Sequence, residues 1–548
     1  MIDTLTVVLA QIDLLVGDME GNADKIVDAI ARARDQHFAD LVVFPELSLS
    51  GYPPEDLLLR PELWRRVEHC LAGIRRCVFG IDVLVGLPEA TDEGLFNSAY
   101  WLRCGEILGR YRKQLLPNYG VFDEKRYFTA GTEPCVVELQ GVSIGVTICE
   151  DIWSPGPAAQ AKAAGAQMLV NLNASPFDRL KPGARKASVA ARVRETGLPV
   201  VYVNLVGGQD ELVFDGGSFV MGRQGGKVFS APAFEDGLYA LTFDTGTGEP
   251  IPRSGPVWVA ESEEALIYRA LVVGTRDYIR KNGFDGAVIG LSGGIDSALT
   301  AAIATDALGA ERVNVVMMPY RYTAAMSLED AEAEAEALGI DYRVIPIEEP
   351  VLAFQQVLSS SFEGMERDVT EENIQARCRG VILMALSNKL GRMLLTTGNK
   401  SEMSVGYATL YGDMAGGYAP LKDVPKTLVY RLAEYRNSLS PVIPQRVLDR
   451  PPSAELAPDQ KDADSLPPYE VLDPILEAYV ERDLAIDEIV ASGFDTTTVT
   501  RVARMVDRNE YKRRQAPPGV RITLRAFGRD RRYPISSGFG RRPCAPES

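Results

Sequence analysis

Histidine is nearly absent from this sequence, which has two histidines, His37 and His69, among 548 residues. His69 lies in a stretch of helical character beside charged residues, and we interpret both histidines as surface or packing residues. Their scarcity excludes most Cys–His and Ser–His catalytic schemes and most zinc sites. A nucleophile in this chain therefore needs a base other than histidine.

Positive charge, paired cysteines and long apolar runs are also lacking. The formal net charge of -17 argues against a sequence-independent nucleic-acid binder, because such a protein needs a basic field. The 7 cysteines are scattered without metal-type pairing, which indicates reduced thiols. The sequence has no signal-peptide pattern and no apolar run of membrane length. We therefore expect a cytoplasmic protein without a membrane or nucleic-acid partner.

Length and periodicity predict two α/β domains. A chain of 548 residues exceeds what one hydrophobic core normally serves. In the first half, apolar strand-like runs such as residues 5–10, 41–44 and 142–148 alternate with helical stretches, a pattern typical of a layered α/β domain. A stretch rich in Gly, Pro and Thr, residues 244–257, indicates the connection. We therefore place the first domain, the linker and the second domain at residues 1–245, 246–260 and 261–548.

The second half contains a buried strand, a glycine-rich loop and a helix in direct succession. Residues 287–291 lead into Ser292-Gly293-Gly294-Ile295-Asp296-Ser297, and a helical pattern follows at 298–308. The backbone N–H groups and the helix dipole at such a junction favour a phosphate, with a plain glycine-rich turn as the alternative. The loop lacks a Walker A lysine, which argues against ordinary γ-phosphoryl transfer, and Asp296 can hold Mg²⁺ on a polyphosphate. The candidate ATP-binding residues of this junction are Gly290, Leu291, Ser292, Gly293, Gly294, Ile295, Asp296 and Ser297.

Three further stretches of the second half have distinct patterns. A buried strand at residues 393–397 ends in the loop 398–402, which we expect at the same pocket, because ligands of open parallel sheets gather beyond the strand C-termini. The acidic run at 327–338 indicates a helix with a solvated charged face. The Pro- and Asp-rich residues 449–469 predict a loop that is mobile or ordered by a partner.

Three residues of the first half together suggest a catalytic site. Glu46 follows the strand at 41–44, Lys113 follows Tyr111-Arg112, and Cys149 follows the strand at 142–148. Taken alone, each residue also has a purely structural interpretation: Glu46 as a helix-capping acid, Lys113 as a surface charge and Cys149 as a small buried hydrophobic residue. Together they supply a base, a cation that favours thiolate and oxyanion, and a nucleophile, without histidine.

The motifs around these residues resemble those of the nitrilase, or carbon–nitrogen hydrolase, superfamily, over roughly residues 1–245. The resemblance rests on Phe44-Pro45-Glu46, Tyr111-Arg112-Lys113 and Ile148-Cys149-Glu150-Asp151. It implies a four-layer αββα sandwich, amide hydrolysis through a thioester, and a homo-oligomer. The loop at 292–297 is similar to that of the N-type ATP pyrophosphatases, which implies a Rossmann-like, doubly wound parallel sheet.

The combination of both halves resembles the glutamine-dependent NAD⁺ synthetase family over almost the whole chain. The second half carries this resemblance in residues 372–377, 397–402, 411–413, 420–422 and 509–514. The resemblance implies ATP-dependent amidation of deamido-NAD⁺ to NAD⁺, the final step of NAD biosynthesis. The ammonia would come from L-glutamine through a protected tunnel, with AMP, pyrophosphate and glutamate as the other products.

The same resemblance implies further site residues. Tyr119, Ser175 and Lys181 would bind glutamine, and Thr397 would bind ATP. Asp296 and Glu402 would hold Mg²⁺, and the deamido-NAD⁺ residues would be Asn373, Glu402 and Lys512. From the residues alone, Asn373 could equally be a helix cap and Lys512 a solvated charge.

Three other functions are compatible with the motifs. One is a different glutamine-dependent adenylating amidotransferase, with the same ammonia chemistry and another acceptor. A second is a nitrilase that acts on another amide, joined to an unrelated ATP-dependent activation. A third is a non-catalytic nucleotide sensor, which the two intact sets of candidate residues disfavour.

Overall fold

The computed structural model describes residues 4–259, 262–457 and 460–538. The chain divides into two compact units, Met1–Glu261 and Ser262–Ser548. Much of the predicted connection, 246–260, packs on the first unit: β15 (Ile251–Pro252) pairs with β14, and the Trp258 N–H donates to Ser230 Oγ at 2.8 Å. The ends of the predicted domain ranges and the end of the linker, residues 1–3, 260–261 and 539–548, lie outside the described residues.

The first unit contains two large mixed sheets and the short hairpin β10–β11 (Val206–Gln209 and Leu212–Asp215). The seven-stranded sheet has the order β15-β14-β1-β2-β3-β4-β5, with β1 (Thr4–Gln11), β2 (Leu41–Val43), β3 (Asp82–Thr91), β4 (Gly94–Arg103), β5 (Glu106–Arg112) and β14 (Gly237–Asp244). The six-stranded sheet has the order β13-β12-β9-β8-β7-β6, with β6 (Cys135–Leu139), β7 (Val142–Ile148), β8 (Met168–Asn173), β9 (Val200–Asn204), β12 (Phe219–Met221) and β13 (Lys227–Ser230).

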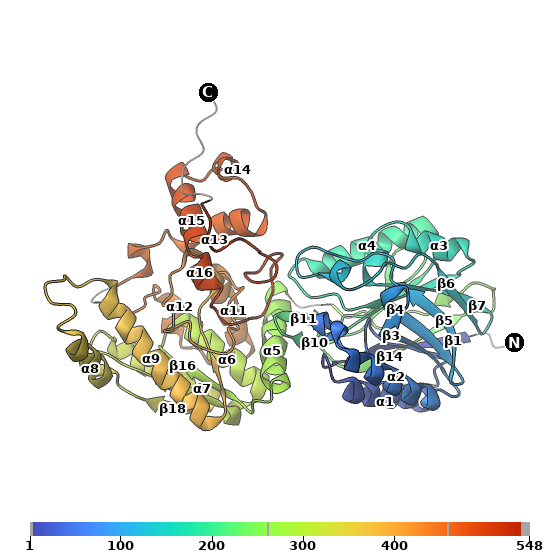
Figure 1. Cartoon of the computed structure of the whole chain (residues 1–548), viewed down its shortest axis with the longest axis horizontal. Coiled ribbons are helices and arrows are strands. Elements are labelled where there is room, and N and C mark those ends of the chain that lie inside the picture. Colours follow the sequence, from blue (N-terminus) through green and yellow to red (C-terminus); the bar gives the residue numbers. More distant parts are fainter. Residues whose placement is uncertain (1–3, 260–261, 458–459, 539–548) are drawn as a thin grey trace. The chain divides into compact units, whose positions relative to one another are not determined.

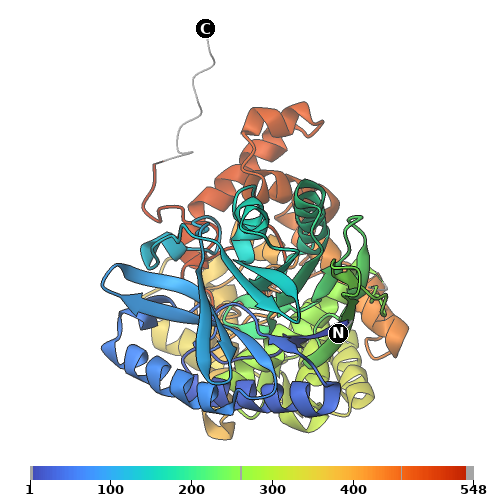
Figure 2. The ribbon, with the colours of Figure 1, turned by 90° about the vertical axis from the view of Figure 1, so that its right-hand side faces the viewer.

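Helices cover the outer face of each sheet, so the first unit has four layers. Figures 1 and 2 show α1 (Met19–His37) and α2 (Pro61–Cys77) along one outer side and α3 (Pro157–Ala163) and α4 (Lys181–Thr196) along the opposite side. The facing sides of the sheets share an apolar core that includes Trp101, Ile148 and Phe243. Short 3-10 helices lie at Glu55–Leu59 (η1), Glu124–Arg126 (η2) and Cys149–Ile152 (η3). The predicted αββα sandwich is confirmed.

The second unit is built on a parallel sheet of order β18-β17-β16-β19. Its strands are β16 (Ala287–Gly290), β17 (Val313–Met317), β18 (Asp341–Val344) and β19 (Met393–Leu395). Because β17 and β19 lie on opposite sides of β16, the strand order reverses there, and ligands of doubly wound sheets bind at such a reversal. The predicted doubly wound parallel sheet is confirmed.

Helices pack on both faces of this sheet. Val288 of β16 packs with Ile374 and Cys378 of α9, while Ile289 points to the opposite face because side chains alternate along a strand. The helix α6 also packs against β16. The α-helices of the unit are α5 (Glu263–Lys281), α6 (Ile295–Leu308), α7 (Ala325–Leu338), α8 (Glu348–Leu358), α9 (Val369–Leu390), α10 (Lys400–Val405), α11 (Lys426–Leu439), α12 (Gln445–Asp449), α13 (Tyr469–Leu476), α14 (Ile486–Ala491), α15 (Thr496–Arg508) and α16 (Glu510–Arg513).

Two stretches of the second unit differ from their expected surroundings. The acidic helix α7 is not simply a solvated charged face, because Asp330 is 3% and Glu334 is 0% exposed. The loop at 449–469, apart from residues 458–459, which lie outside the described part, contacts the rest of the unit. Arg450 Nη2 donates to the Gly293 carbonyl at 2.7 Å. No helix of the described residues has the length and apolar character needed to cross a membrane.

Candidate functional site

The three predicted catalytic residues follow the ends of three strands and are all buried. Glu46 lies just beyond β2, Lys113 directly follows β5, and Cys149 directly follows β7. Their exposed fractions are 1%, 1% and 4%. Cys149 has a φ of +44°, in the left-handed region that a non-glycine residue adopts only at sharp, well-held turns.

Hydrogen bonds fix the carboxylate and the ammonium of this cluster. Lys113 Nζ donates to Glu46 Oε1 at 2.7 Å and to Glu124 Oε1 at 2.8 Å. Asn97 Nδ2 also donates to Glu46 Oε1 at 2.7 Å, and the Ala174 N–H donates to Glu46 Oε2 at 2.9 Å. Glu46 is therefore held from three sides in one orientation.

Burial and charge set the protonation states of these groups. Burial favours the neutral amine of Lys113, but the carboxylates of Glu124 and Glu46 outweigh it and raise the Lys113 pKa well above its usual value. Burial also raises the pKa of Glu124 to about 7, against the opposing effect of Lys113. The Cys149 pKa is raised well above its usual value by burial and by Glu46, and Lys113 lowers it only in part. The resting thiol is therefore protonated and needs a base as it reacts.

The predicted glutamine-binding residues lie near Cys149. The Tyr119 hydroxyl donates to the Glu150 carboxylate at 3.0 Å. Burial is the main cause that raises the pKa of this tyrosine, and the charges of Glu150 and Cys149 raise it as well. Burial lowers the pKa of Lys181, while Cys149 and Glu150 act in the opposite direction. Ser175 is 1% exposed. Tyr119 and Lys181 thus lie within electrostatic range of the thiol, and Ser175 directly follows Ala174, whose N–H holds Glu46.

The phosphate loop connects β16 to α6 through a turn that requires glycine. Gly293 has a φ of +74°, and a Cβ there would lie 2.3 Å from the Ser327 carbonyl oxygen. The Ser292 N–H donates to Ser297 Oγ at 3.2 Å, and Ser297 Oγ donates to the Gly294 carbonyl at 2.9 Å. These bonds close the loop at the N-terminus of α6, where N–H groups and the helix dipole favour an anion.

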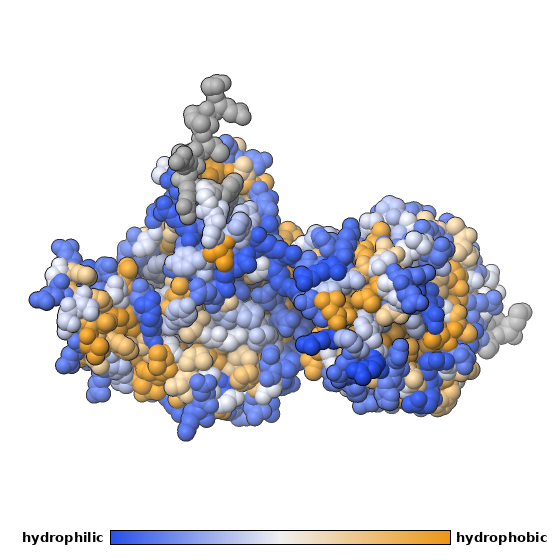
Figure 3. Space-filling view, viewed as in Figure 1, coloured by the Kyte–Doolittle hydropathy of each residue, from blue (hydrophilic) through white to orange (hydrophobic). Residues whose placement is uncertain are grey.

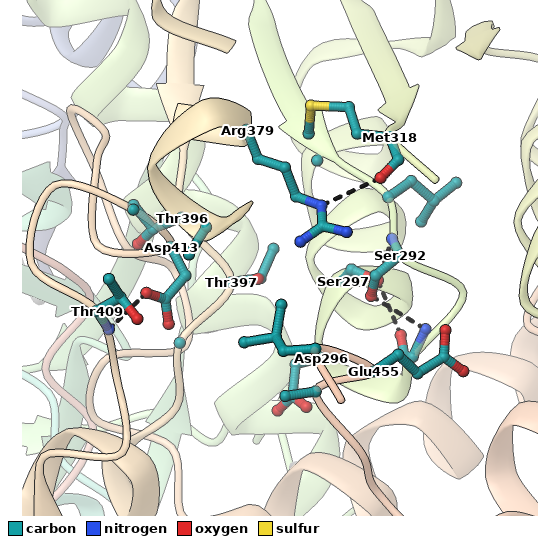
Figure 4. A pocket seen from close by; sticks show the side chains of 18 of the residues that line it. Ser292, Asp296, Ser297, Met318, Arg379, Thr396, Thr397, Thr409, Asp413 and Glu455 are labelled. Carbon is teal, nitrogen blue, oxygen red and sulfur yellow. Dashed lines mark hydrogen bonds between the residues drawn. The ribbon is translucent and has the colours of Figure 1, made fainter. Parts of the chain in front are cut away.

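A cavity of about 270 Å³ opens above this loop (Figure 4). Eight of the predicted residues line it: Gly290, Leu291, Ser292, Gly294, Asp296, Ser297, Thr397 and Glu402. Two predicted loop residues do not, since Gly293 packs on Ser327 and Ile295 is buried in the core. The loops after β16 and β19 thus face one pocket, as their places beyond the strand ends predicted.

Two carboxylates of this pocket converge on one ammonium. Lys426 Nζ forms ion pairs with Asp296 and, at 3.2 Å, with Glu402 Oε1. Asn399 Nδ2 donates to Asp296 Oδ1 at 2.8 Å. Burial, against the opposing effect of Lys426 and together with the charge of Asp296, raises the pKa of Glu402 to about 8. Carboxyl groups from both loops therefore converge on one cation.

This donor set fits a magnesium ion carried on a polyphosphate. Mg²⁺ usually takes one or two protein carboxylates, with phosphate oxygens and waters as its other ligands. Asp296 and Glu402 provide two such carboxylates beside the phosphate loop. Across residues 4–259, 262–457 and 460–538, no group of three or more His, Cys, Asp or Glu side chains could hold a metal by itself. The ion would thus depend on the nucleotide.

Asn373 and Lys512, predicted to bind deamido-NAD⁺, both contact the loop at 406–409. Asn373 Oδ1 accepts a hydrogen bond from Thr409 Oγ1 at 2.9 Å. Lys512 Nζ donates to the carbonyls of Gly406 and Ala408, each at 2.8 Å. Neither residue lines the cavity, whereas Thr409 does. Both therefore support one wall of the pocket.

Glu124, Arg379 and Lys426 are among the polar residues of the two sites that the sequence alone did not indicate. Glu124 lies in the charged run 123–126, which has the character of a surface loop. Arg379, whose guanidinium points into the cavity, comes from the middle of α9 (Figure 4). Lys426 is the first residue of α11, where a cation opposes the helix dipole. That unfavourable position is the one local signal that distinguishes Lys426 from a surface lysine.

Comparison with known proteins gives a family match for each half of the chain. The carbon-nitrogen hydrolase family matches residues 6–253, and the NAD synthase family matches residues 267–516. A glutamine-dependent NAD⁺ synthetase of Acinetobacter baylyi is 49% identical, over 97% of this chain and 98% of its own. One from Thermotoga maritima is 46% identical, over 98% of this chain and 99% of its own.

A solved structure is similar over the same extent. The glutamine-dependent NAD⁺ synthetase of Acinetobacter baumannii, in complex with adenosine diphosphate, is 48% identical and has a TM-score of 0.80. The match covers 98% of this chain and 99% of that one. The two relatives and the solved structure each match nearly the whole chain. The two family matches lie within the same extent, one in each half. The chain belongs to the family of glutamine-dependent NAD⁺ synthetases.

Proposed function

We propose that this protein converts deamido-NAD⁺ to NAD⁺ with ATP and with ammonia from L-glutamine, the final step of NAD biosynthesis. The observation that carries the proposal is that one chain combines the Glu46–Lys113–Cys149 cluster with the phosphate loop that faces Asp296 and Glu402. The relatives named glutamine-dependent NAD⁺ synthetase support it. We assign glutamine hydrolysis to residues 1–245, the connection to 246–260 and NAD⁺ synthesis to 261–548.

The first reaction breaks the side-chain amide of glutamine. Cys149 Sγ attacks the amide carbon while its proton passes to Glu46, and the new oxyanion lies beside Lys113 Nζ. Glu46 then protonates the amide nitrogen, the C–N bond breaks, and ammonia departs. The remaining acyl group is bound to Cys149 as a thioester. Water attacks the thioester and gives a proton to Glu46, and the C–S bond breaks as the proton returns to sulfur. Tyr119, Ser175 and Lys181 would hold the amino-acid end of the substrate.

The second reaction activates the nicotinate carboxylate. A carboxylate oxygen attacks the α-phosphorus of ATP, and the bond to pyrophosphate breaks. The N–H groups of residues 292–297 and the α6 N-terminus would stabilise the departing pyrophosphate. Thr397 would contact ATP, and Asn373, Glu402 and Lys512 would serve the deamido-NAD⁺ side. Ammonia then attacks the acyl carbon, loses a proton and displaces AMP.

Magnesium would be held by Asp296 and Glu402, beside Lys426. When bound, Mg²⁺ neutralises phosphate charge and so favours departure of pyrophosphate. The proximity of both carboxylates to the phosphate loop supports this assignment. Lys426 would share the neutralising role, because its ammonium already faces the same two carboxylates.

A protected route for ammonia between the two sites completes the proposal. Ammonia is mostly protonated in neutral water, and the ammonium ion cannot attack the acyl adenylate. A tunnel that excludes water would therefore deliver the reactive form. The reduced thiol required of Cys149 supports a cytoplasmic location, and the cysteines of the described residues are free.

We also propose a homo-oligomer. Exposed apolar side chains gather on α8 and α9, among them Phe354 at 50%, Val357 at 76% and Val381 at 65% exposure. Figure 3 shows hydrophobic residues over this part of the second unit. Burial of such side chains in a second copy would remove apolar surface from water.

One assay tests the proposed function against its rivals. The purified protein is incubated with deamido-NAD⁺, ATP, Mg²⁺ and glutamine, and NAD⁺ and AMP are measured. Formation of both, dependent on every component, supports the proposal. AMP without NAD⁺ would instead favour another adenylated acceptor, and no turnover would favour a nucleotide sensor.

A further inference from the structure

The Asp151 carboxylate is completely buried and accepts four hydrogen bonds. Its Oδ1 accepts the backbone N–H groups of Gln114, at 3.2 Å, and Leu115, at 2.8 Å. Its Oδ2 accepts the backbone N–H of Ile148, at 3.0 Å, and the Tyr111 hydroxyl, at 2.8 Å. One side chain thus joins two separate backbone segments.

These two segments carry the reacting groups of the proposed glutaminase site. Three of the four donors flank Lys113 along the chain, and the fourth, Ile148, directly precedes Cys149. Lys113 follows a strand of the seven-stranded sheet, whereas Cys149 follows a strand of the six-stranded sheet. Since the two sheets share no hydrogen-bond ladder, the strand pairing does not fix the separation of these strand ends. Asp151 connects them directly.

The turn at Cys149 also needs support. Its φ of +44° is a strained conformation for a cysteine and persists only where neighbouring contacts hold it. The bond from the Ile148 N–H to Asp151 closes this turn from within η3. Burial raises the Asp151 pKa to about 6, while the Leu115 and Ile148 N–H groups lower it, so the group is a carboxylate at neutral pH.

We propose that Asp151 is a positioning residue of the glutaminase site, which holds the Cys149 turn and the Lys113 segment at the separation that oxyanion formation requires. This role rests on the proposed function of Cys149 and Lys113. Asp151 touches neither substrate nor reacting atoms and acts through the backbone. Its loss would therefore lower the rate of the chemical step more than the affinity for glutamine.

Asp151→Asn is the main test. Asparagine has nearly the same volume as aspartate, but its NH₂ group cannot accept a hydrogen bond. It must therefore face the donors of either Oδ1 or Oδ2, and the hydrogen bonds on that side are lost. Because small misplacements of reacting groups can cost ~10²-fold in rate, we expect a loss of this order in glutaminase kcat, with KM near the parent value. Ammonia-driven NAD⁺ synthesis in the same preparation should stay at the parent rate. The pH profile of Cys149 alkylation by iodoacetamide should shift, because the thiol's position relative to Lys113 changes.

Asp82→Asn is the matched control. Asp82 is also a buried carboxylate of the first unit and accepts the Trp101 indole N–H at 2.6 Å, but it lies at the start of β3. We expect this variant to keep the parent kcat and alkylation profile. Tyr111→Phe removes one donor and leaves the backbone bonds, so it should lower kcat by roughly threefold.

The outcomes separate the inference from the function on which it rests. Parent kcat in folded Asp151→Asn, or equal loss of glutaminase and ammonia-driven activity, would overturn the positioning role. If Asp151→Asn does not fold, Tyr111→Phe decides, and a parent kcat there overturns it. Glutaminase activity that is absent from the parent, or retained by Cys149→Ser, would instead contradict the proposed function itself.

Discussion

Lys113 and Glu46 form an ion pair with an N···O distance of 2.7 Å, and neither side chain is exposed to solvent. In the proposed reaction, the Lys113 ammonium stabilises the oxyanion, so Lys113→Met should lower glutaminase kcat by on the order of 10²-fold or more, with a smaller change in KM. Lys125→Met, at an exposed lysine of the same loop region, is the control. Steady-state glutaminase assays measure both. A parent kcat in Lys113→Met would remove the assignment of Lys113.

Glu124 should make stability depend on pH near neutrality. Burial raises its folded pKa from 4.5 to about 7. Its protonated form therefore contributes stability that is fully present below pH 4.5 and is lost as the pH rises through about 7. Glu124→Gln lacks this contribution.

Urea unfolding of the parent and of Glu124→Gln at pH 5 and pH 8 measures the effect. The parent's free energy of unfolding, relative to that of the variant, should be lower at pH 8 than at pH 5. A difference between the two proteins that does not change with pH would contradict the raised pKa.

Asp296→Asn should abolish NAD⁺ synthesis and spare glutamine hydrolysis, whereas a change at Cys149 should abolish glutamine hydrolysis and spare synthesis from ammonia. Asparagine keeps the volume but removes the charge that a hard cation prefers. We expect pyrophosphate release and NAD⁺ formation to fail with glutamine and with ammonia, while glutamine hydrolysis persists. Capping does not explain a loss, because Gly294 is the N-cap of α6 and asparagine caps nearly as well as aspartate, within ~1 kcal/mol. Near-parent pyrophosphate release would contradict the metal role.

Glu334 is a buried carboxyl whose oxygens have no hydrogen-bond partner among the described residues. Burial and the nearby Asp330 raise its pKa well above 4.5. Its stabilising contribution is therefore present below pH 4.5 and lost as the pH rises through the folded pKa. Glu334→Met should raise the free energy of unfolding at pH 8, because the buried polar group disappears.

Thermal or urea unfolding at pH 8 measures this gain. Glu336→Met, at an exposed position of the same helix, should leave stability nearly unchanged. A Glu334→Met protein that is less stable than the parent at pH 8 would contradict the view that the buried Glu334 carboxyl lacks a stabilising partner.

Short-range patterns predicted the parts of the sites that lie next to a strand end. An apolar run that forms a strand precedes each of Cys149, Asp296 and Thr397 in the chain. The hydrophobic pattern alone therefore indicates that these residues lie beyond strand ends, at the edge of a sheet. The four-layer sandwich came from the family resemblance. The pairing of β1 with β14, in which Thr4 meets Asp244, has no local sequence signal.

Glu124, Asp151 and Glu334 acquire their buried environments through distant contacts that leave no local sequence signal. Glu124 is a loop carboxyl in sequence and acquires a role only because folding places it 2.8 Å from Lys113 Nζ. Asp151 lies in the motif Ile148-Cys149-Glu150-Asp151, yet its connection to Tyr111 depends on how the two sheets pack. Glu334 lies in an acidic run that suggested solvent, and its burial reflects tertiary packing around α7.

The central claim is that one chain performs two separable reactions, and Cys149→Ala tests it most directly. NAD⁺ formation from deamido-NAD⁺, ATP and Mg²⁺ is measured with glutamine and, in parallel, with ammonium chloride as the nitrogen donor. We predict that synthesis from glutamine falls to background while synthesis from ammonium chloride stays near the parent rate. Equal loss with both donors, in a variant that unfolds at the parent urea midpoint, would contradict the account.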